Sequence, residues 1–391
     1  MKEICHKNEC TGCSACMNVC AHKAITMHAD ACGFLYPNIS QEKCVHCGLC
    51  VKTCPVNNPI SFEKPQKCFA TTATDEQELL SCSSGGAATI ISKYIISQEG
   101  VVYGCSAKNP HNVQHTRVDK IDDLEHLKGS KYVQSYLGNS FQDIKKDLCE
   151  KRIVLFVGTP CQVAGLKGFL HKDYPNLFTI DLVCHGVPSQ KMLNETLNYY
   201  ISDEKQIDLA FRRKNLQLKI PKIEFGLELK DKYGSQSLFK LYNKDYYMFG
   251  FLRCLIFREN CYSCPYAQNK RVGDLTLSDF WGLQGDAGFE IGKGVSAVLV
   301  NTAKGDDLFE KAKNTLIWKK REVSEATRWN DQLNHPSIKP KNYEKFINLY
   351  ANETFKDAMV KAYYGEYIYD FYIKYKNRLK VFLQKHHVLR S

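Results

Sequence analysis

Two cysteine runs near the start of the chain carry the clearest chemical pattern in this sequence. Residues 10–20 read CTGCSACMNVC and residues 44–55 read CVHCGLCVKTCP, so the spacing C-x2-C-x2-C-x3-C occurs twice. Thiolates at this spacing are typical ligands of cuboidal [4Fe–4S] clusters, because the first three wrap one face of a cluster while the fourth points toward a second cluster. The runs therefore predict two [4Fe–4S] clusters, which carry electrons one at a time.

The ligand assignment follows from the crossing of the fourth cysteine in each run. Cluster I is expected to take Cys10, Cys13, Cys16 and Cys54, and cluster II to take Cys44, Cys47, Cys50 and Cys20. Gly12 and Gly48 are small where the backbone must pass close to a cluster, and Pro55 follows the last ligand. Zinc is the alternative metal, but its sites usually come as two separated cysteine pairs. The segment resembles bacterial two-cluster ferredoxins.

The composition favours a cytoplasmic metalloprotein. Of 391 residues, 44% are hydrophobic and 24% charged, which suits a globular chain of two or three domains. No apolar run approaches the roughly 18 residues of a membrane-spanning helix, and the start has no apolar signal segment. Nineteen cysteines in such a chain favour metal binding over disulfides. The net charge of +11 comes without a nucleic-acid-binding motif, so no nucleic-acid partner is expected.

The middle of the chain alternates between strand-like and helix-like segments. After a proline-containing linker at 57–66, strands are expected at 68–74, 101–104, 153–157, 177–183 and 273–282, and helices at 86–97 and 161–170. Short strands at 24–26 and 34–37 are expected to roof the clusters. Strand–helix–strand units of these lengths favour a parallel sheet, so the fold class is α/β (mixed α+β).

Four further cysteines are candidates for a third cluster. Cys161 and Cys184 each follow an expected strand, which places both at the carboxyl edge of the sheet, where such folds bind ligands. Cys261 and Cys264 form a CxxC pair in CYSCP. A third [4Fe–4S] cluster on these four is predicted; a zinc site, or ordinary buried thiols at the first two, are the alternatives. Cys105 and Cys254 are possible substitute ligands, and Cys5, Cys32, Cys68, Cys82 and Cys149 are expected to be small hydrophobic side chains.

A Ser/Gly-rich turn before the 86–97 helix offers a seat for a flavin. One-electron carriers that feed organic chemistry need a converter, and flavin is the usual one. Residues 81–89 read SCSSGGAAT, where the hydroxyls of Ser83 and Ser84 and free helix amides suit a phosphate. A simple helix N-cap is the alternative.

Six segments, in this order, resemble the beta-subunit family of coenzyme F420 hydrogenases and dehydrogenases. They read SSGGAAT (83–89), GSKYVQS (129–135), VGTPCQVAGL (157–166), LVCHGVPS (182–189), CYSCPYA (261–267) and GDLTLSDFWG (273–282). Members are flavin-dependent iron–sulfur oxidoreductases, many with an N-terminal two-cluster ferredoxin. The resemblance implies that the protein binds FAD. It also implies which residues lie near the FAD: Ser83, Ser84, Gly85, Gly86, Lys131, Thr159 and Gln162. It does not fix the substrate.

Together these patterns predict four segments. They are a two-cluster ferredoxin-type domain at 1–62, the N-terminal and C-terminal parts of a flavin and iron–sulfur domain at 67–150 and 151–335, and a helical basic tail at 336–391. The predicted function is an oxidoreductase that passes electrons from ferredoxin-type clusters through FAD to an unidentified organic acceptor, or the reverse. The alternative is an electron-transfer subunit without its own substrate site. The expected partner is a ferredoxin-like protein, and the oligomeric state is left open.

Two basic segments and one histidine have alternative interpretations. The stretch 209–223 is expected to be a solvated surface, with contact to an acidic partner or to phosphates as the alternative. The basic tail from Lys374 to Arg390 is expected to pack on its own domain, with a membrane surface as the alternative. His185, beside Cys184, is a candidate proton donor, although an imidazole that supports the cluster is the favoured role.

Overall fold

The N-terminal segment folds into a small unit in which each cysteine run enters a short helix. The structure, a computed structural model, describes residues 3–201, 207–218, 221–231, 237–283 and 288–385, with side chains up to residue 370. Helices α1 (Ala15–Val19) and α2 (Leu49–Thr53) lie within the two runs, each just before the fourth cysteine, and contact each other. Strands β1 (Ile25–Ala29) and β2 (Leu35–Ile39) form an antiparallel pair beside them, as the sequence predicts.

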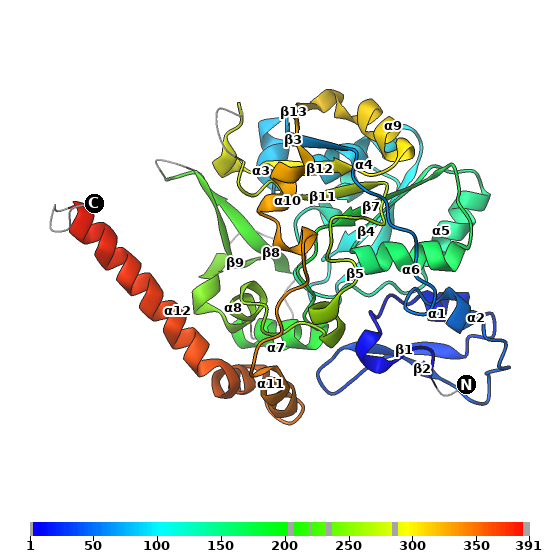
Figure 1. The fold of residues 1–391 in the computed structure, drawn as a ribbon, viewed down its shortest axis with the longest axis horizontal. Coiled ribbons are helices and arrows are strands. Elements are labelled where there is room, and N and C mark those ends of the chain that lie inside the picture. Colours follow the sequence, from blue (N-terminus) through cyan, green and yellow to red (C-terminus); the bar gives the residue numbers. More distant parts are fainter. Residues whose placement is uncertain (1–2, 202–206, 219–220, 232–236, 284–287, 386–391) are drawn as a thin grey trace.

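An eight-stranded mixed sheet forms the centre of the molecule (Figure 1). In spatial order its strands are β13 (Leu316–Arg321), β3 (Lys67–Ala73), β12 (Ser296–Val300), β11 (Leu275–Asp279), β7 (Leu177–Leu182), β6 (Val154–Gly158), β4 (Val101–Ser106) and β5 (Gln114–Val118). The four strands β11, β7, β6 and β4 are parallel, whereas β5, β12, β3 and β13 pair antiparallel with their neighbours. The expected parallel sheet is therefore correct for the centre and wrong for the flanks, where short connections such as the one between β4 and β5 return the chain antiparallel.

Helices cover both faces of this sheet. Alternate residues of β4 point to opposite faces, Val102 into a core with α4 (Ala87–Ser97) and α9 (Ala303–Ala312), and Val101 into a core with α5 (Ser140–Cys149) and α6 (Pro160–Leu170). The N-terminal unit packs on the second of these faces, where α1 contacts α5 and α6 (Figure 1). The remaining helices on the sheet side are α3 (Glu76–Ser81) and α10 (Val323–Arg328), with 3-10 turns at Asp122–Leu127, Ile291–Lys293, Lys313–Thr315 and Asp331–Leu333.

A second, three-stranded sheet and a helical cluster complete the fold. Strands β8 (Ile207–Asn215), β9 (Lys222–Asp231) and β10 (Ser237–Leu241) are antiparallel. They share a core with α7 (Gln190–Tyr200), α8 (Tyr246–Leu252), α11 (Tyr343–Tyr350) and the start of α12 (Phe355–Lys385). Further 3-10 turns lie at Lys7–Glu9, Tyr242–Lys244 and Glu259–Ser263.

The C-terminal helix α12 packs only in part. Phe355, Ala358 and Met359 are buried, and the backbone leaves helical geometry at Tyr363. Tyr367 still donates to Asn243 O (2.6 Å) and Asp370 pairs with Arg253, whereas the last turns of α12 extend away from the body (Figure 1). The basic tail from Lys374 is expected from the sequence to pack on its own domain, but the helix from Lys374 to Lys385 extends away from the body (Figure 1); residues 386–391 lie outside the described residues. No helix in the described ranges is both long and apolar enough to cross a bilayer.

Candidate iron–sulfur and flavin site

The cysteines assigned to cluster I line one pocket. Cys10, Cys13 and Cys16 from the first run meet Cys54, which caps the C-terminus of α2. We call these four residues the cluster I set. The fourth cysteine of the second run thus lies with the first run, as the crossing rule requires. The loop reaches this shape because Gly12 (φ 68°) and Ser14 (φ 59°) adopt left-handed backbone conformations.

Burial and mutual repulsion shape the acidity of these thiols. Burial raises the pKa of Cys13 to about 12, and burial together with the thiolates of Cys13 and Cys10 raises the pKa of Cys16 well above its usual value. A hydrogen bond from Cys5 lowers the pKa of Cys10 to about 6, and the guanidinium of Arg258 lowers it further. Thiolate ligands suit iron, so a bound cluster would replace this repulsion with metal–sulfur bonds.

Cys5 is a fifth thiol in the same pocket, which corrects the expectation that it is only a small hydrophobic side chain. It lines the pocket, and its thiol hydrogen-bonds to both Cys10 and Cys54. No spacing rule marks it, because it lies outside the four-cysteine pattern. Of the other cysteines expected to be small buried side chains, Cys32, Cys68 and Cys82 are buried, whereas Cys149 is exposed at the end of α5, so that expectation is wrong there.

The second run stands closer to solvent. The thiolates of Cys47 and Cys20 both raise the pKa of Cys50, after the larger effect of burial, so Cys20 lies with the second run. We call Cys44, Cys47, Cys50 and Cys20 the cluster II set. Cys47 is exposed, and the neighbouring Val45 and Leu49 expose 56% and 43% of their surfaces.

The four cysteines predicted for a third cluster come together from three elements. Cys161 lies in the first turn of α6, Cys184 follows β7, and Cys261 and Cys264 lie in and just after a 3-10 turn. Burial raises the pKa of Cys184 to about 12, with further increases from the Cys161 and Cys264 thiolates. Cys184, Cys264 and Cys161 likewise raise the pKa of Cys261 beyond the effect of burial. We call these four the third set; each keeps some accessible surface.

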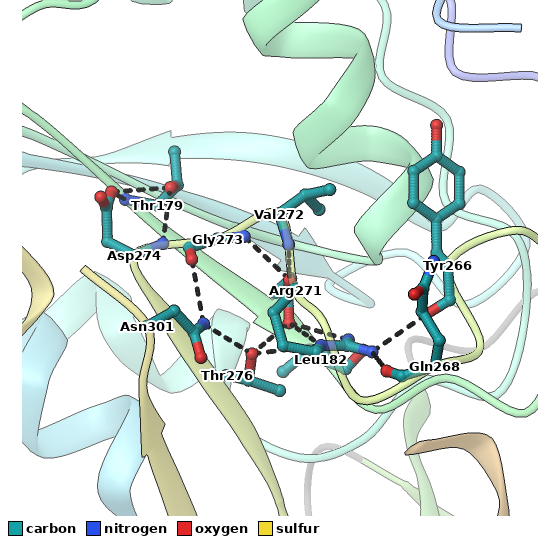
Figure 2. A network of polar contacts seen from close by, with 11 residues as sticks. Thr179, Leu182, Tyr266, Gln268, Arg271, Val272, Gly273, Asp274, Thr276 and Asn301 are labelled. Carbon is teal, nitrogen blue, oxygen red and sulfur yellow. Dashed lines mark hydrogen bonds and ion pairs between the residues drawn. The ribbon is translucent and has the colours of Figure 1, made fainter. Parts of the chain in front are cut away.

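A buried polar network holds the third set in place (Figure 2). Arg271 donates from Nη2 to Asp181 Oδ1 (2.8 Å), and both side chains are almost fully buried. The same guanidinium donates from Nη1 to the carbonyl oxygens of Tyr266 (3.0 Å) and Gln268 (3.2 Å). Asp181 lies on β7 just before Cys184, and Tyr266 follows Cys264, so this ion pair fixes the two chain segments that carry three of the four thiols.

Helix α6 connects the cluster I set to the third set. A Cβ on Gly165 would lie 2.9 Å from Cys13 Cβ and 3.0 Å from Cys13 Sγ, and Gly165 is one turn beyond Cys161. Tyr266 is buried between the sets: burial raises its pKa, and Cys161, Cys13 and Cys264 add to the shift. Neither Cys105, which is near Lys131, nor Cys254, whose thiol bonds Ser337, is needed as a substitute.

No preformed single-ion site accompanies these groups. Across the described residues, no three or more His, Cys, Asp and Glu side chains are arranged to hold one metal ion. The thiols of the cluster I set line a pocket, and a four-iron cluster spreads its ligands around a cuboid. The fit to a cluster therefore rests on the donor set, four thiols in each of three groups.

The 83–86 loop lies against the carboxyl end of the sheet and begins α4. Gly86 (φ 87°) is the N-cap of α4 and makes no side-chain cap bond. Ser83 Oγ accepts from Ser130 N (2.8 Å), Ser84 Oγ donates to Val295 O (3.0 Å), and Gly85 N donates to Ser296 Oγ (3.0 Å). The serine hydroxyls thus shape the loop, while the first helix amides remain available to an anion.

Cations surround this loop. Lys131 Nζ donates to the carbonyl oxygens of Leu127 (2.7 Å) and Lys128 (2.5 Å), and burial lowers its pKa to about 8. Lys214 on β8 donates to Ser84 O (2.9 Å), and burial lowers its pKa to about 8 as well. Burial disfavours the charged form of both lysines. A bound anion would therefore stabilise their charges and be stabilised by them.

The basic stretch 209–223 is therefore not a solvated surface throughout, because it forms β8 and the start of β9. Arg212 pairs with Asp279 at 2.8 Å, donates to Ser83 O (3.4 Å), and exposes only 11% of its side chain. Lys222 is exposed as expected, and Lys219 lies outside the described residues. Sequence reasoning missed Arg212 because β8 brings it into the interior only through tertiary packing.

Thr159, Gln162 and His185 complete the picture. Thr159 and Gln162 form a capping box at the start of α6, where Thr159 N donates to Gln162 Oε1 (2.9 Å) and Thr159 Oγ1 contacts Cys161 Sγ (3.2 Å). They position Cys161, and their role beside a flavin stays a prediction. His185 is exposed at the surface, yet its packed surroundings lower its pKa; Arg212 also lowers this pKa, while Asp279 and Asp331 raise it, so His185 lies near the Arg212–Asp279 ion pair.

Comparison with known proteins identifies two families along the chain. The model for the C terminus of the beta subunit of coenzyme F420 hydrogenase/dehydrogenase matches residues 151–326, and that of the 4Fe-4S dicluster domain matches residues 9–58. A chain of the F420-reducing [NiFe] hydrogenase complex from Methanosarcina barkeri, studied by xenon derivatization, aligns at 16% identity and TM-score 0.45, covering 71% of this chain and 97% of that chain. No curated protein matches. Residues 9–58 thus form a 4Fe-4S dicluster domain, and residues 151–326 belong to the family described as the C terminus of the coenzyme F420 hydrogenase/dehydrogenase beta subunit.

Proposed function

We propose that this protein is an iron–sulfur flavoprotein oxidoreductase, in which three [4Fe–4S] clusters connect a one-electron carrier protein to FAD and an organic acceptor, or the reverse. The contact at α6 supports this most strongly, because Gly165 packs on Cys13 of the cluster I set one turn after Cys161 of the third set. Carriers exchange electrons only when they lie close together, and this contact joins two of the sets.

The exposed cluster II loop suits the exchange with a partner. Val45 and Leu49 flank the exposed Cys47 and give the loop an apolar surface. A ferredoxin-like protein that docks there would meet the set that lies closest to solvent. The domain division at 1–62, 67–335 and 336–391 belongs to this proposal, since β3 joins the same sheet as β12 and β13.

The 83–86 loop would hold the pyrophosphate of FAD. The free amides at the start of α4, together with Lys131 and Lys214, supply positive charge on one side of the loop. When bound, the clusters supply single-electron transfer and the flavin converts single electrons to pairs. His185 lies near Arg212, where its imidazole would be placed to give a proton to an acceptor; this role belongs to the proposal.

Anaerobic purification with iron, sulfide and flavin quantified tests the proposal. Twelve irons, about four per cluster, and about one FAD per chain are expected. Lys131→Met should lower the bound FAD without lowering the iron, while Lys341→Met, at an exposed position, should change neither. About eight irons would remove the third cluster, and zinc without flavin would refute the whole assignment.

Turnover distinguishes an enzyme from an electron-transfer subunit. If small organic acceptors reoxidise the reduced flavin, the enzyme proposal stands. If the flavin and clusters reoxidise only through a partner protein, the chain is an electron-transfer subunit, which the exposed cluster II loop also favours.

A further inference from the structure

Arg258 is a buried cation that joins the cluster I set to the third set. Its side chain is only 1% exposed. Nε donates to the carbonyl oxygen of Cys10 at 2.8 Å, while its own backbone carbonyl accepts from the amide of Cys261 at 2.9 Å. One residue therefore connects the loop that carries the first cluster I ligand to the turn that carries two thiols of the third set.

The charge of Arg258 has no carboxylate partner among the described residues. Two other buried arginines do have one: Arg271 pairs with Asp181 and Arg212 pairs with Asp279, each at 2.8 Å. Arg258 Nη1 instead donates to the amide oxygen of Gln134 (3.4 Å).

The remaining surroundings of this guanidinium are aromatic or empty of acceptors. It lies 4.0 Å from the centroid of the Tyr36 ring, and Nη2 has no hydrogen-bond partner within the described part of the chain. A buried, unpaired cation is unfavourable unless an anion lies beside it. The four thiolates around cluster I are the anion that this geometry provides, since Nε bonds the backbone of Cys10 and a Cβ on Gly12 would lie 3.3 Å from Nη1.

We propose that Arg258 is the counter-charge of cluster I and sets its reduction potential above that of cluster II. This inference rests on the proposed function. A nearby positive charge favours the reduced, more negative state, and net charge and solvent exposure are established determinants of cluster potentials. The cluster II set lies at the exposed loop, where Cys47 is exposed and a Cβ on Gly48 would meet nothing within 4 Å. The difference between the two environments favours inward electron flow.

The step is a single-electron transfer without chemistry at the protein. A one-electron carrier protein reduces cluster II; cluster II is then reoxidised by one electron as cluster I is reduced by one. No proton or ligand moves. Arg258 acts through the field at cluster I and is thus a positioning residue, which a potential can test.

An anaerobic redox titration followed by electron paramagnetic resonance tests this role. In Arg258→Gln, the signal of one cluster should appear at a reduction potential at least 59 mV more negative than in the wild type. This shift is a tenfold change in the ratio of oxidised to reduced cluster at a fixed potential. Arg258→Lys keeps the charge and should shift the signal less. Arg328→Gln, at an exposed position of α10, should leave every potential unchanged.

The assignment to cluster I needs two further backgrounds. The shift should persist in Cys47→Ser and in Cys184→Ser, which remove ligands of cluster II and of the third cluster. A shift that vanishes in either background overturns the assignment, as does an Arg258→Gln protein with full iron content and wild-type potentials.

A second variant guards against loss of folding. Gln134→Glu keeps Arg258 and places a carboxylate beside Nη1, so it should shift the same signal in the same direction. If Arg258→Gln binds no iron, unchanged potentials in Gln134→Glu overturn the inference. A wild-type protein without clusters would instead refute the proposed function, so the two failures are distinguishable.

Discussion

Gly12 lies just before the second cysteine of the first run and Gly48 just after the second cysteine of the second run, and their different surroundings allow a test of how the N-terminal unit docks. Both have a left-handed backbone, with φ of 68° and 76°. A Cβ on Gly12 would lie 2.5 Å from Gln134 Nε2, 3.1 Å from the carbonyl oxygen of Leu35 and 3.3 Å from Arg258 Nη1. A Cβ on Gly48 would meet nothing within 4 Å. Alanine should therefore be costlier at Gly12.

The expected difference can be estimated from these contacts. Placing alanine in a left-handed conformation costs about 1–2 kcal/mol at either position. At Gly12 the crowded Cβ adds about 1–3 kcal/mol, because the buried Gln134 and the Leu35 backbone leave it little room. Gly12→Ala should thus lose about 2–5 kcal/mol of stability and Gly48→Ala about 1–2 kcal/mol, on the sum of the two terms.

Urea unfolding of anaerobically prepared protein measures this difference. With a slope of about 2 kcal/mol per molar urea, an extra 1–3 kcal/mol lowers the unfolding midpoint of Gly12→Ala by roughly 0.5–1.5 M relative to Gly48→Ala. Gly12→Ala should also change the potential of cluster I, since it displaces Arg258. Equal midpoints for the two variants would contradict the docking of the first run on Gln134 and Arg258.

Three further predictions rest on other contacts in the structure. Gly168→Ala places a Cβ 2.6 Å from Thr53 O and should lower the free energy of unfolding in urea by about 0–2 kcal/mol net. Gly365→Ala in α12, whose Cβ would meet nothing within 4 Å, should raise it by about 0.5–1 kcal/mol. A gain at both positions would contradict the α6 contact. Asp181→Asn leaves its buried arginine partner unpaired and should cost about 3–5 kcal/mol and lower the iron from about twelve to about eight per chain, because the third set loses its support; unchanged iron would contradict that role. Burial lowers the pKa of Lys131 to about 8, so Lys131 loses its charge as pH rises through about 8 and the affinity for FAD should fall over the same range. Lys131→Met should make the dependence of FAD affinity on pH shallower. A pH series of flavin titrations measures both.

Much of the fold was predictable from local pattern. The strands at 67–73, 101–106, 154–158 and 177–182 lie within a few residues of the expected ranges, because buried strand runs and flanking glycines are local signals. The family and the dicluster domain are confirmed by the matches at 151–326 and 9–58. The ligand sets and the flavin contacts stay predictions, although the thiols gather as the spacing rule requires.

The residues that sequence reasoning missed act through tertiary contacts. Arg258 and Arg271 are common basic residues in sequence, and only the packed structure places one without a carboxylate and the other beside Asp181. Cys5 precedes the motif and so carries no spacing signal, yet it reaches the pocket. The antiparallel flanks of the sheet depend on which edge each connection returns to, which periodicity does not encode.

The two cysteine runs have the same cysteine spacing, but they lie in different surroundings in the fold. The first run packs on Gly165 of α6 and on Arg258, while the second contacts α6 through Thr53 but leaves Cys47, Val45 and Leu49 at the surface. Repeated ligands alone would give two similar clusters with no preferred direction of transfer. A direction requires unequal surroundings, and here a buried cation and a neighbouring thiol set lie at only one of the two. The asymmetry therefore arises from what the repeat packs against, which is why the Arg258 potential is the measurement that best tests the proposed route.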